Sequence, residues 1–291
     1  MNNSKIISKT NLEIVRSFDG RNITTVLFDF DGTLSRERDG WINLMVATCS
    51  GAMVQALPQM AVTEAIAWII REIESTIGIP TYQQMKRMAD EIIRRGGQGL
   101  SPQRYKDVYT LALEAMVKTA HQKMLRGELS IGELRVPGAI DLLEKLAAKL
   151  GREALFLASG TDIKPIQESV RFLGYEQFFG DRIIASGSNG NHEECPKQAI
   201  VETLVAERKL KPGQLLTFGD GVPEIKYTRS VGGITVGVLS PDQSHYAFTG
   251  HFTIAGKKKR LIDAGAHVLV PDFRSADELL EVVFSKQVGH E

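Results

Sequence analysis

Short apolar runs alternate with amphipathic stretches along most of this chain. Three runs end in small or acidic residues, which is typical of strands buried on both faces of a parallel sheet: 25–30 (TVLFDF), 153–159 (EALFLAS) and 215–220 (LLTFGD). Weaker runs of the same kind are residues 181–186, 233–239 and 266–270. Helical periodicity lies between them, at 138–150, 163–173, 197–208 and 275–284. This alternation predicts an α/β fold with a doubly wound, parallel, Rossmann-like sheet, because right-handed crossovers place helices on both faces.

Residues 36–133 interrupt the alternation with a stretch that contains no convincing strand. Long amphipathic runs lie within it, at 60–75 and 102–125. Ser101 is suited to cap the second run and Pro102 to begin it, because serine accepts hydrogen bonds from the first N–H groups of a helix and proline needs no partner there. We therefore expect an α-helical cap domain, residues 36–133, inserted after the first strand.

The other residues divide into an N-terminal extension, residues 1–23, and the α/β core, residues 24–35 and 134–291. Asp19 and Gly20 form an Asp-Gly pair, which is typical of a tight turn between two antiparallel strands. A small hairpin is therefore expected around this pair.

The composition is that of an ordinary globular protein, with 43% hydrophobic and 24% charged residues among 291. Lysine plus arginine number 35, as do aspartate plus glutamate, so no net charge attracts nucleic acid or an anionic membrane. The one basic cluster, residues 257–260 (KKKR), is expected to be a solvated surface. We expect neither nucleic acid nor membrane as a partner.

Location is indicated by what the sequence lacks. No stretch approaches the roughly 18 consecutive apolar residues of a membrane-spanning helix, and the first residues lack the apolar centre of a signal peptide. Cys49 and Cys195 are too few for a disulfide framework and are expected to be inert thiols. A cytoplasmic location is therefore predicted.

Polar residues follow three of the predicted strands, at the sheet edge where open parallel folds collect their ligands. They are Asp29, Asp31, Gly32 and Thr33 after the first strand, Ser159, Gly160 and Thr161 after the second, and Asp220 and Glu224 after the third. Lys197 begins the helix that precedes the third strand.

This set resembles the haloacid-dehalogenase-like superfamily, in its phosphatase branch. Residues 29–34 (DFDGTL) look like the first motif of that family, 158–161 (ASGT) the second, Lys197 the third and 219–224 (GDGVPE) the fourth, in the same order and spacing. The insertion matches the helical cap of the family in location and helicity. The fourth motif differs in having Glu224 where many members have a second aspartate.

The charges alone also predict a cation at this edge. Four carboxylates would meet there, those of Asp29, Asp31, Asp220 and Glu224. Two unit charges about 4 Å apart repel by roughly 4 kcal/mol at an effective dielectric constant near 20, so the four cannot share a site unaided. Hard oxygen ligands favour Mg²⁺. Lys197 would add positive charge for phosphoryl oxygens, and Ser159, Thr161 and the N–H groups near Gly160 would donate hydrogen bonds to them.

The resemblance implies a mechanism with two aspartates in distinct roles. Asp29 would attack phosphorus and form an aspartyl-phosphate. Asp31 would protonate the departing oxygen and later deprotonate the water that releases phosphate. The metal would be held by the Asp29 carboxylate, the Asp31 backbone carbonyl and Asp220, with Glu224 supporting it through water. Gly32 would permit the tight turn after the nucleophile, and Thr33 would hold that turn in place and contribute to phosphate binding.

Three residues that lead into the cap are candidates for recognising the leaving group: Arg36, Arg38 and Trp41. The alternative reading is a solvated linker with a core tryptophan. Aromatic residues within the cap helices, such as Trp68 and Tyr109, are expected to pack in the core of the cap.

The predicted function is hydrolysis of a small phosphorylated metabolite, because a cap over the site limits access by larger substrates. One alternative is a phosphosugar mutase, which returns the phosphoryl group to sugar. A dehalogenase is disfavoured by Asp31, since cleavage of a carbon–halogen bond needs no acid for the leaving group. A non-catalytic phosphometabolite sensor would lack the nucleophile, the acid or a metal ligand, all of which are present.

Overall fold

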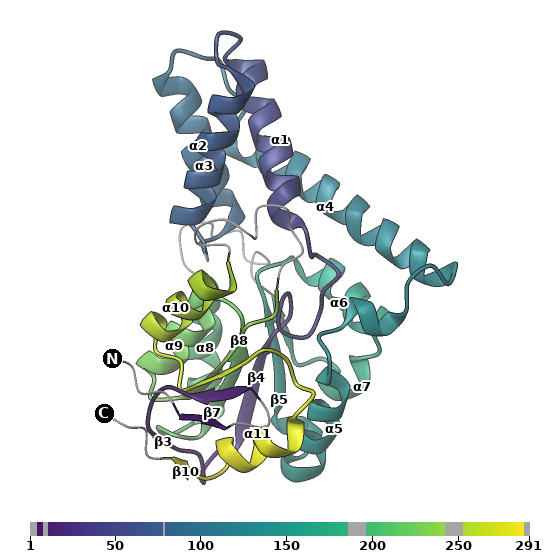
Figure 1. Ribbon diagram of the computed structural model, residues 1–291, viewed down its shortest axis with the longest axis vertical. Helices are drawn as coiled ribbons and strands as arrows, with labels where there is room; N and C mark the ends of the chain where they lie inside the picture. Colours follow the sequence, from purple (N-terminus) through teal and green to yellow (C-terminus); the bar gives the residue numbers. More distant parts are fainter. Residues whose placement is uncertain (1–4, 8–10, 78, 186–195, 242–252, 288–291) are drawn as a thin grey trace.

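The computed structural model describes residues 5–7, 11–77, 79–185, 196–241 and 253–287. It has two parts, a body in which helices surround a twisted sheet and a second group of helices standing over one end of that body (Figure 1).

In the described part of the chain, the body is built on an eight-stranded sheet. Its order is β1 (Lys5–Ile7), β2 (Leu12–Ile14), β9 (Val268–Val270), β8 (Ile234–Val238), β7 (Leu215–Gly219), β4 (Thr25–Asp29), β5 (Leu155–Ser159) and β6 (Ile183–Ala185). The strands from β9 to β6 are parallel, whereas β1 and β2 pair antiparallel. All six predicted strands are present, and the predicted α/β class is confirmed. Because β5 and β7 flank β4 on opposite sides, the carboxyl end of β4 lies at a switch point of the topology.

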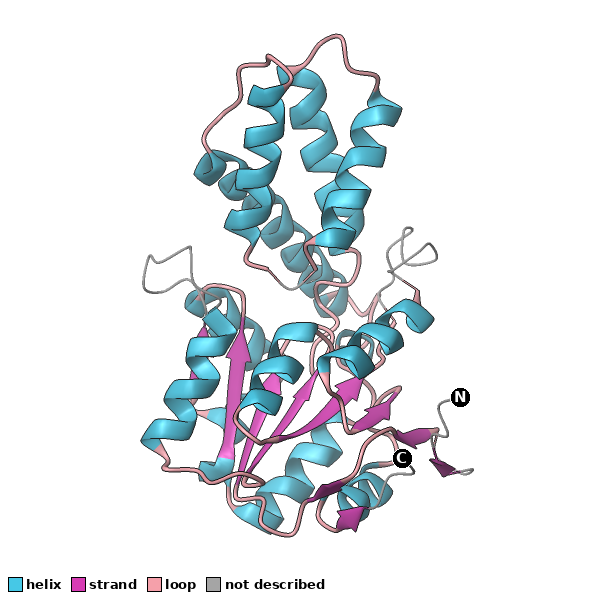
Figure 2. Cartoon of the chain, turned by 90° about the vertical axis from the view of Figure 1, so that its left-hand side faces the viewer, coloured by secondary structure: helices cyan, strands magenta, loops and turns pink. Residues whose placement is uncertain are grey.

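Helices cover both faces of the sheet (Figure 2). They are α5 (Ala139–Leu150), α6 (Ile163–Phe172), α7 (Glu176–Phe179), α8 (Pro196–Glu207), α9 (Val222–Ser230), α10 (Ile254–Ala264) and α11 (Ala276–Val283). Successive residues of β4 point to opposite faces. Val26 and Phe28 belong to the apolar cluster that includes α5 and α11, whereas Leu27 packs with Ile200 and Leu204 of α8. This burial on both faces explains why the strands read as continuous apolar runs.

The inserted stretch folds as α1 (Trp41–Ala56), α2 (Val62–Ser75), α3 (Thr81–Arg94) and α4 (Pro102–Leu125). These helices and the segments between them, called the cap below, have a hydrophobic cluster of their own that includes Met53 and Ile69. As predicted, Ser101 caps α4 by accepting a hydrogen bond from Arg104 N–H. The parallel strands point their carboxyl ends toward the cap (Figure 2), so the cap lies over the edge where the candidate residues were expected. The domain division at residues 36 and 133 stays a prediction.

The expected hairpin around Asp19 and Gly20 does not form. β1 and β2 pair with each other instead, and β3 (Phe18–Asp19) pairs with β10 (Lys286–Gln287) near the other end of the chain. Gly20 lies against the carbonyl oxygen of Val283, where an added Cβ would come within 1.6 Å of that oxygen. The glycine therefore serves this close approach between distant segments, and long-range pairing overrides the local turn preference of Asp-Gly.

The chain leaves the core and returns to it through two adjacent segments, residues 34–36 and 134–136, which we call the stalk. Ser35 forms an antiparallel β-bridge with Arg135. Backbone hydrogen bonds of 2.9 Å lie on either side of this bridge. The two connections of the cap are thus held together side by side.

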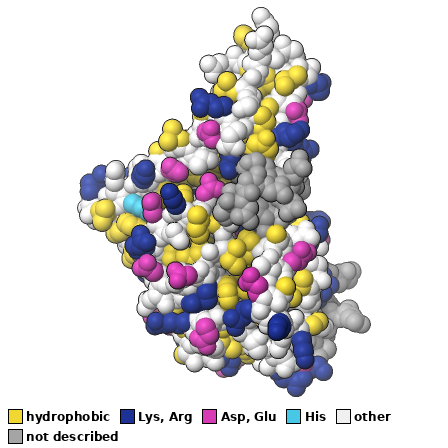
Figure 3. Space-filling view, turned by 180° about the vertical axis from the view of Figure 1, so that it is seen from behind, with side chains coloured by type: hydrophobic (Ala, Val, Ile, Leu, Met, Phe, Trp, Pro, Cys, Tyr) yellow, Lys and Arg dark blue, Asp and Glu magenta, His cyan; other side chains and the backbone are white. Residues whose placement is uncertain are grey.

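The surface agrees with the balanced composition. On the described part of the face in Figure 3, acidic and basic side chains are interspersed. None of the described helices combines the length and the apolar character needed to cross a membrane. Cys49 is buried in the cap, and Cys195 lies outside the described residues.

His267 is a buried, uncharged histidine beside the sheet. Its Nδ1 accepts a hydrogen bond from Thr235 N–H (3.0 Å), and the residue is 2% exposed. Burial, together with the charges of Arg229 and Arg16, lowers the pKa of His267 from 6.5 to about 3. Protonation is therefore far easier in the unfolded chain than in the folded protein.

We expect the free energy of unfolding to fall as the pH drops below about 6.5, because His267 takes up its proton only on unfolding. The contribution of His267 is fully present above that pH and is lost at about 1.4 kcal/mol per pH unit below it. The measurement is urea denaturation between pH 5 and 7.5 for the wild type and His267→Asn, whose amide oxygen retains an acceptor for Thr235. The variant should show a shallower dependence on pH, and an unchanged slope would contradict this account.

Candidate active site

Asp29 is the last residue of β4, and the loop that follows it turns sharply. The carbonyl oxygen of Phe30 accepts backbone hydrogen bonds from Thr33 (3.2 Å), Leu34 (2.8 Å) and Ser35 (2.9 Å). Gly32 adopts a φ of 74°, and a Cβ there would lie 2.2 Å from Asp220 Oδ2. Only glycine tolerates both the left-handed backbone and this approach. The turn therefore brings the loop against Asp220, as the sequence predicted for Gly32.

Three carboxylates converge at this edge of the sheet. One oxygen from each of Asp29, Asp220 and Glu224 lies within 4.8 Å of the others. Asp220 follows β7, the neighbour of β4, so parallel pairing places the two aspartates together. Glu224 lies in the first turn of α9, where its Oε1 accepts the N–H of Gly221 (2.6 Å). The resemblance implied that Glu224 supports the metal, and the structure brings its carboxylate into the cluster while it also accepts a helix N–H group.

Lys197 stands between two of these carboxylates. Its Nζ donates to Asp29 Oδ1 (2.7 Å) and to Glu224 Oε2 (2.8 Å). Burial alone would lower the pKa of Lys197, but the carboxylates of Asp29 and Glu224 outweigh it and raise that pKa above its usual value. Lys197 is therefore a permanent cation that touches the proposed nucleophile. Lys164, a lysine in the first turn of α6 that follows the second motif, is instead exposed.

The negative charge of the cluster exceeds what Lys197 neutralises. Burial raises the pKa of Asp29 well above its usual value, Lys197 opposes the shift, and the charges of Glu224 and Asp220 add to it. A further cation at this point would relieve the repulsion and hold Asp29 in its ionised, nucleophilic form.

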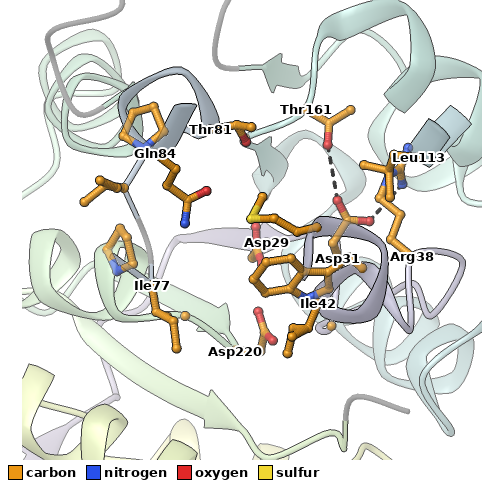
Figure 4. A pocket seen from close by; sticks show the side chains of 18 of the residues that line it. Asp29, Asp31, Arg38, Ile42, Ile77, Thr81, Gln84, Leu113, Thr161 and Asp220 are labelled. Carbon is orange, nitrogen blue, oxygen red and sulfur yellow. Dashed lines mark hydrogen bonds and ion pairs between the residues drawn. The ribbon is translucent and has the colours of Figure 1, made fainter. Parts of the chain in front are cut away.

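Asp31 lies two residues beyond Asp29 and points into the same space (Figure 4). Its Oδ1 accepts a hydrogen bond from Arg38 Nη1 (2.8 Å), and its Oδ2 lies 3.4 Å from the hydroxyl of Thr161. Burial raises the pKa of Asp31, although the ion pair with Arg38 partly offsets this. A carboxyl group with a raised pKa is suited to giving up a proton at higher pH than an exposed aspartate can.

Arg38 is itself held by a buried network that reaches the cap. Glu37 Oε2 lies 3.9 Å from Arg38 Nη1, and the other Glu37 oxygen contacts Nε2 of His121 on α4. The His121 ring stacks on Phe172 of α6, with 3.6 Å between ring centroids. This network therefore links Asp31 on the core to a helix of the cap.

Lys257 joins the site although the sequence analysis placed it on a solvated surface. Its Nζ donates to Asp220 Oδ2 (2.9 Å) and to the carbonyl oxygen of Ser240 (2.8 Å), and its side chain is 13% exposed. Arg260, one helical turn on, lines the same cavity. Lys259, at 77% exposure, does behave as a solvated residue. The expectation for residues 257–260 is therefore wrong for the two members that face the site.

The candidates for binding phosphate differ in whether they reach the cavity. Gly160 and Thr161 line the cavity, whereas Ser159 is buried behind them and accepts the N–H of Thr161 (3.1 Å) on its Oγ. Thr33 is fully buried beneath the turn, and its hydroxyl has no hydrogen-bond partner among the described atoms. The structure thus does not bring the Thr33 hydroxyl to the cavity.

Only two of the three candidates for recognising the leaving group line the cavity. Arg38 and Trp41 line the cavity. Arg36 does not, and its guanidinium pairs with Asp39 (2.8 Å). Tyr109 is buried in the cap cluster as expected, but it also lines the cavity.

One cavity connects these residues, with a volume of about 380 Å³ between the strand ends and the cap. Its floor carries Asp29, Asp31 and Asp220, and its walls include Ile42, Ile77, Gln84 and Leu113 from the cap (Figure 4). The volume is at the lower end of the range for sites that bind small molecules.

Glu37, His121 and Lys257 were not predicted from the sequence to lie at the site. Glu37 and His121 are 84 positions apart, and Lys257 and Asp220 are 37 apart, so no local pattern joins either pair. One indication of this role was present in the sequence: Lys257 begins a basic run in a segment that follows a predicted strand, and the ends of such strands border the site.

Comparisons with known proteins give a consistent result. The family model described as haloacid dehalogenase-like hydrolase matches residues 23–232. A search of curated proteins finds no match.

Solved structures that resemble the chain include three with low sequence identity. A predicted phosphoglycolate phosphatase from Haemophilus somnus 129PT has a TM-score of 0.52 at 18% identity, covering 90% of this chain and 98% of its own. A HAD family hydrolase from Deinococcus radiodurans R1, with bound phosphate and sodium, has a TM-score of 0.52 at 15% identity, covering 92% of this chain and 100% of its own. A phosphonoacetaldehyde hydrolase-like protein from Oleispira antarctica has a TM-score of 0.56 at 17% identity, covering 92% of this chain and 93% of its own. At these identities the likeness shows a shared fold.

Proposed function

We start from the premise that this chain belongs to the haloacid dehalogenase-like hydrolase family, and we propose that it hydrolyses a small phosphomonoester through an aspartyl-phosphate on Asp29. The observation that carries the proposal is the position of Asp29 at the end of β4, in contact with Lys197 and beside Asp220 and Glu224. A phosphoryl group needs a nucleophile and surrounding positive charge, and this arrangement offers a carboxylate nucleophile with a cation beside it.

The donor set fits a divalent metal ion. The oxygens of Asp29, Asp220 and Glu224 lie within 4.8 Å of one another, and only hard oxygen ligands are present in this group. Such ligands suit Mg²⁺, which also takes substrate phosphate as a ligand. We propose that Asp29, Asp220 and the backbone carbonyl of Asp31 hold Mg²⁺, with Glu224 supporting it. When bound, the ion would neutralise charge on the phosphoryl oxygens.

Within the protein, Asp29 is the group that attacks phosphorus. Lys197 favours its ionised form and would also pair with a phosphoryl oxygen, because its ammonium lies 2.7 Å from the attacking carboxylate. The Gly160 N–H and the Thr161 hydroxyl would bind further oxygens of the phosphoryl group. This assignment keeps the phosphate-binding role that the sequence gave to Gly160 and Lys197, with Ser159 in a supporting position.

Asp31 is the proton donor and acceptor in this proposal. Its protonated form would give its proton to the leaving oxygen as the phosphorus–oxygen bond breaks. The resulting carboxylate, held by Arg38, would then take a proton from the water that attacks the aspartyl-phosphate. Inorganic phosphate and the alcohol are the products, and both aspartates return to their starting states.

The proposal is tested by measuring release of inorganic phosphate from a panel of phosphomonoesters with Mg²⁺ and with EDTA. We expect hydrolysis that requires the metal. A mutase of the same fold would instead return the phosphoryl group to sugar and release little phosphate. Binding of an ester without turnover by the intact protein would argue for a sensor.

Lys257 leads to a separate prediction about metal affinity. Its ammonium already neutralises Asp220, so it competes with a divalent ion for that carboxylate. Replacing Lys257 by methionine should tighten Mg²⁺ binding about five- to tenfold, equivalent to about 1 kcal/mol for a partly buried ion pair. Calorimetric titration of the phosphate-free protein provides the measurement. Lys259→Met, on the solvated side of the same helix, should leave the affinity unchanged; weaker binding by Lys257→Met would refute the competition.

A further inference from the structure

The cap side of the cavity differs in chemistry from its floor. The floor carries charged residues at the strand ends, whereas most of the cap residues that line the cavity are apolar or aromatic. They are Trp41, Ile42, Met45, Ile77, Ile79, Pro80, Tyr82, Tyr109 and Leu113. A phosphoryl group on the floor would therefore direct the rest of its substrate toward this wall, which we call the apolar wall.

Several polar groups near the apolar wall already have protein partners. Gln84 donates its amide to the hydroxyl of Thr76 (3.0 Å), and Asp39 accepts from Arg36 (2.9 Å). Tyr82 and Tyr109 each have a further contact within the protein.

Arg38, which leads into the cap, also lines the cavity, but its guanidinium is held by Asp31 (2.8 Å). In the described part of the cap, two polar residues remain that could meet polar substituents of a substrate. They are Thr81, at the start of α3, and Lys106 on α4. They supply far fewer hydrogen bonds than the several hydroxyls of a sugar would require.

From this distribution we propose that the natural leaving group is apolar, an aliphatic or aromatic alcohol rather than a polyhydroxylated sugar; the inference rests on the proposed function. A sugar against the apolar wall would lose water from its hydroxyls and find few partners in exchange, which is costly for each hydroxyl left unpaired. An apolar alcohol of the same size gains from the same burial. The same difference in binding free energy between the two alcohols applies in the transition state, because the leaving group stays in the cavity while the phosphorus–oxygen bond breaks.

The test uses two esters that share a ring and a phosphate, cyclohexyl phosphate and inositol 1-phosphate. We expect kcat/KM for the cyclohexyl ester to exceed that for the inositol ester by at least about 30-fold, with most of the difference in KM. Acetyl phosphate is included because its small leaving group barely reaches the apolar wall.

A pair of variants on α4 locates the effect. Leu113 lines the cavity, whereas Leu111 on the same helix is 70% exposed and lies outside it. Leu113→Asn should lower kcat/KM for cyclohexyl phosphate about tenfold and change that for inositol 1-phosphate less than about threefold. Leu111→Asn should leave both unchanged, and Leu113→Met should restore the preference, which separates loss of contact from loss of folding.

The outcomes separate the two proposals. If acetyl phosphate and both ring esters release no phosphate with Mg²⁺, the proposed function fails and the inference fails with it. If phosphate is released but the inositol ester is preferred, or the two are used equally, the proposed function stands and the apolar leaving group is overturned. An equal loss on both esters in Leu113→Asn would also overturn it.

Discussion

Asp29→Asn is expected to reduce phosphate release by a factor of at least about 10⁴, because the amide cannot attack phosphorus and no other described carboxylate lies in its place. The substitution preserves size, and Lys197 keeps its contact with Glu224, so the protein should remain folded. The measurement is single-turnover phosphate release with saturating substrate and Mg²⁺, alongside thermal unfolding of the variant.

The matched control for this result is Asp39→Asn. Asp39 borders the same cavity but pairs with Arg36 and stands outside the carboxylate cluster. Its substitution should keep activity within about threefold of the wild type. If Asp29→Asn turned over substrate as fast as this control, the attack by Asp29 would be excluded.

Asp31→Asn is expected to lower kcat by about 10² to 10⁴, the range for removing a positioned acid and base. The loss should be largest for alkyl esters, which need a proton on the leaving oxygen, and smaller for p-nitrophenyl phosphate, whose leaving group departs unaided. Because water attack on the aspartyl-phosphate also slows, phosphorylated enzyme should accumulate and be detected by intact-protein mass spectrometry. An equal loss on both esters, with no phosphorylated enzyme trapped, would remove Asp31 from both steps.

The pH dependence of the wild type bears on the same residue. Burial raises the pKa of Asp31, so its protonated form persists to higher pH than that of an exposed aspartate. For alkyl esters, kcat should fall as the pH rises through this pKa and the acid loses its proton. That decline should be absent in Asp31→Asn.

The sheet could be predicted from the sequence because buried parallel strands carry their signal locally. Thr25–Asp29 and Leu215–Gly219 are buried at every position, and a continuous apolar run is the direct result. The strand-end rule then brought Asp29 and Asp220 together, since parallel neighbours end at one edge. These inferences needed no knowledge of distant contacts.

The features that escaped prediction depend on contacts between distant segments. Nothing near Asp19 and Gly20 reveals that the segment pairs with Lys286–Gln287. Lys257 and Lys259 are two positions apart in one basic run, yet helical geometry turns one toward Asp220 and the other to solvent. Helix α1 lacks strong amphipathic periodicity, since apolar residues such as Trp41 and Met45 line the cavity as well as packing against the cap cluster.

The stalk has a consequence for how such a molecule can diversify. Because Ser35 and Arg135 bridge the two connections, the ends of the inserted segment are neighbours whatever helices lie between them. The bridge already brings the ends of the insertion together, so a longer or shorter insertion adds little loop-closure entropy to the cost of folding the sheet. The part of the protein that contacts the alcohol can thus be lengthened, shortened or replaced while the part that handles phosphorus keeps its geometry.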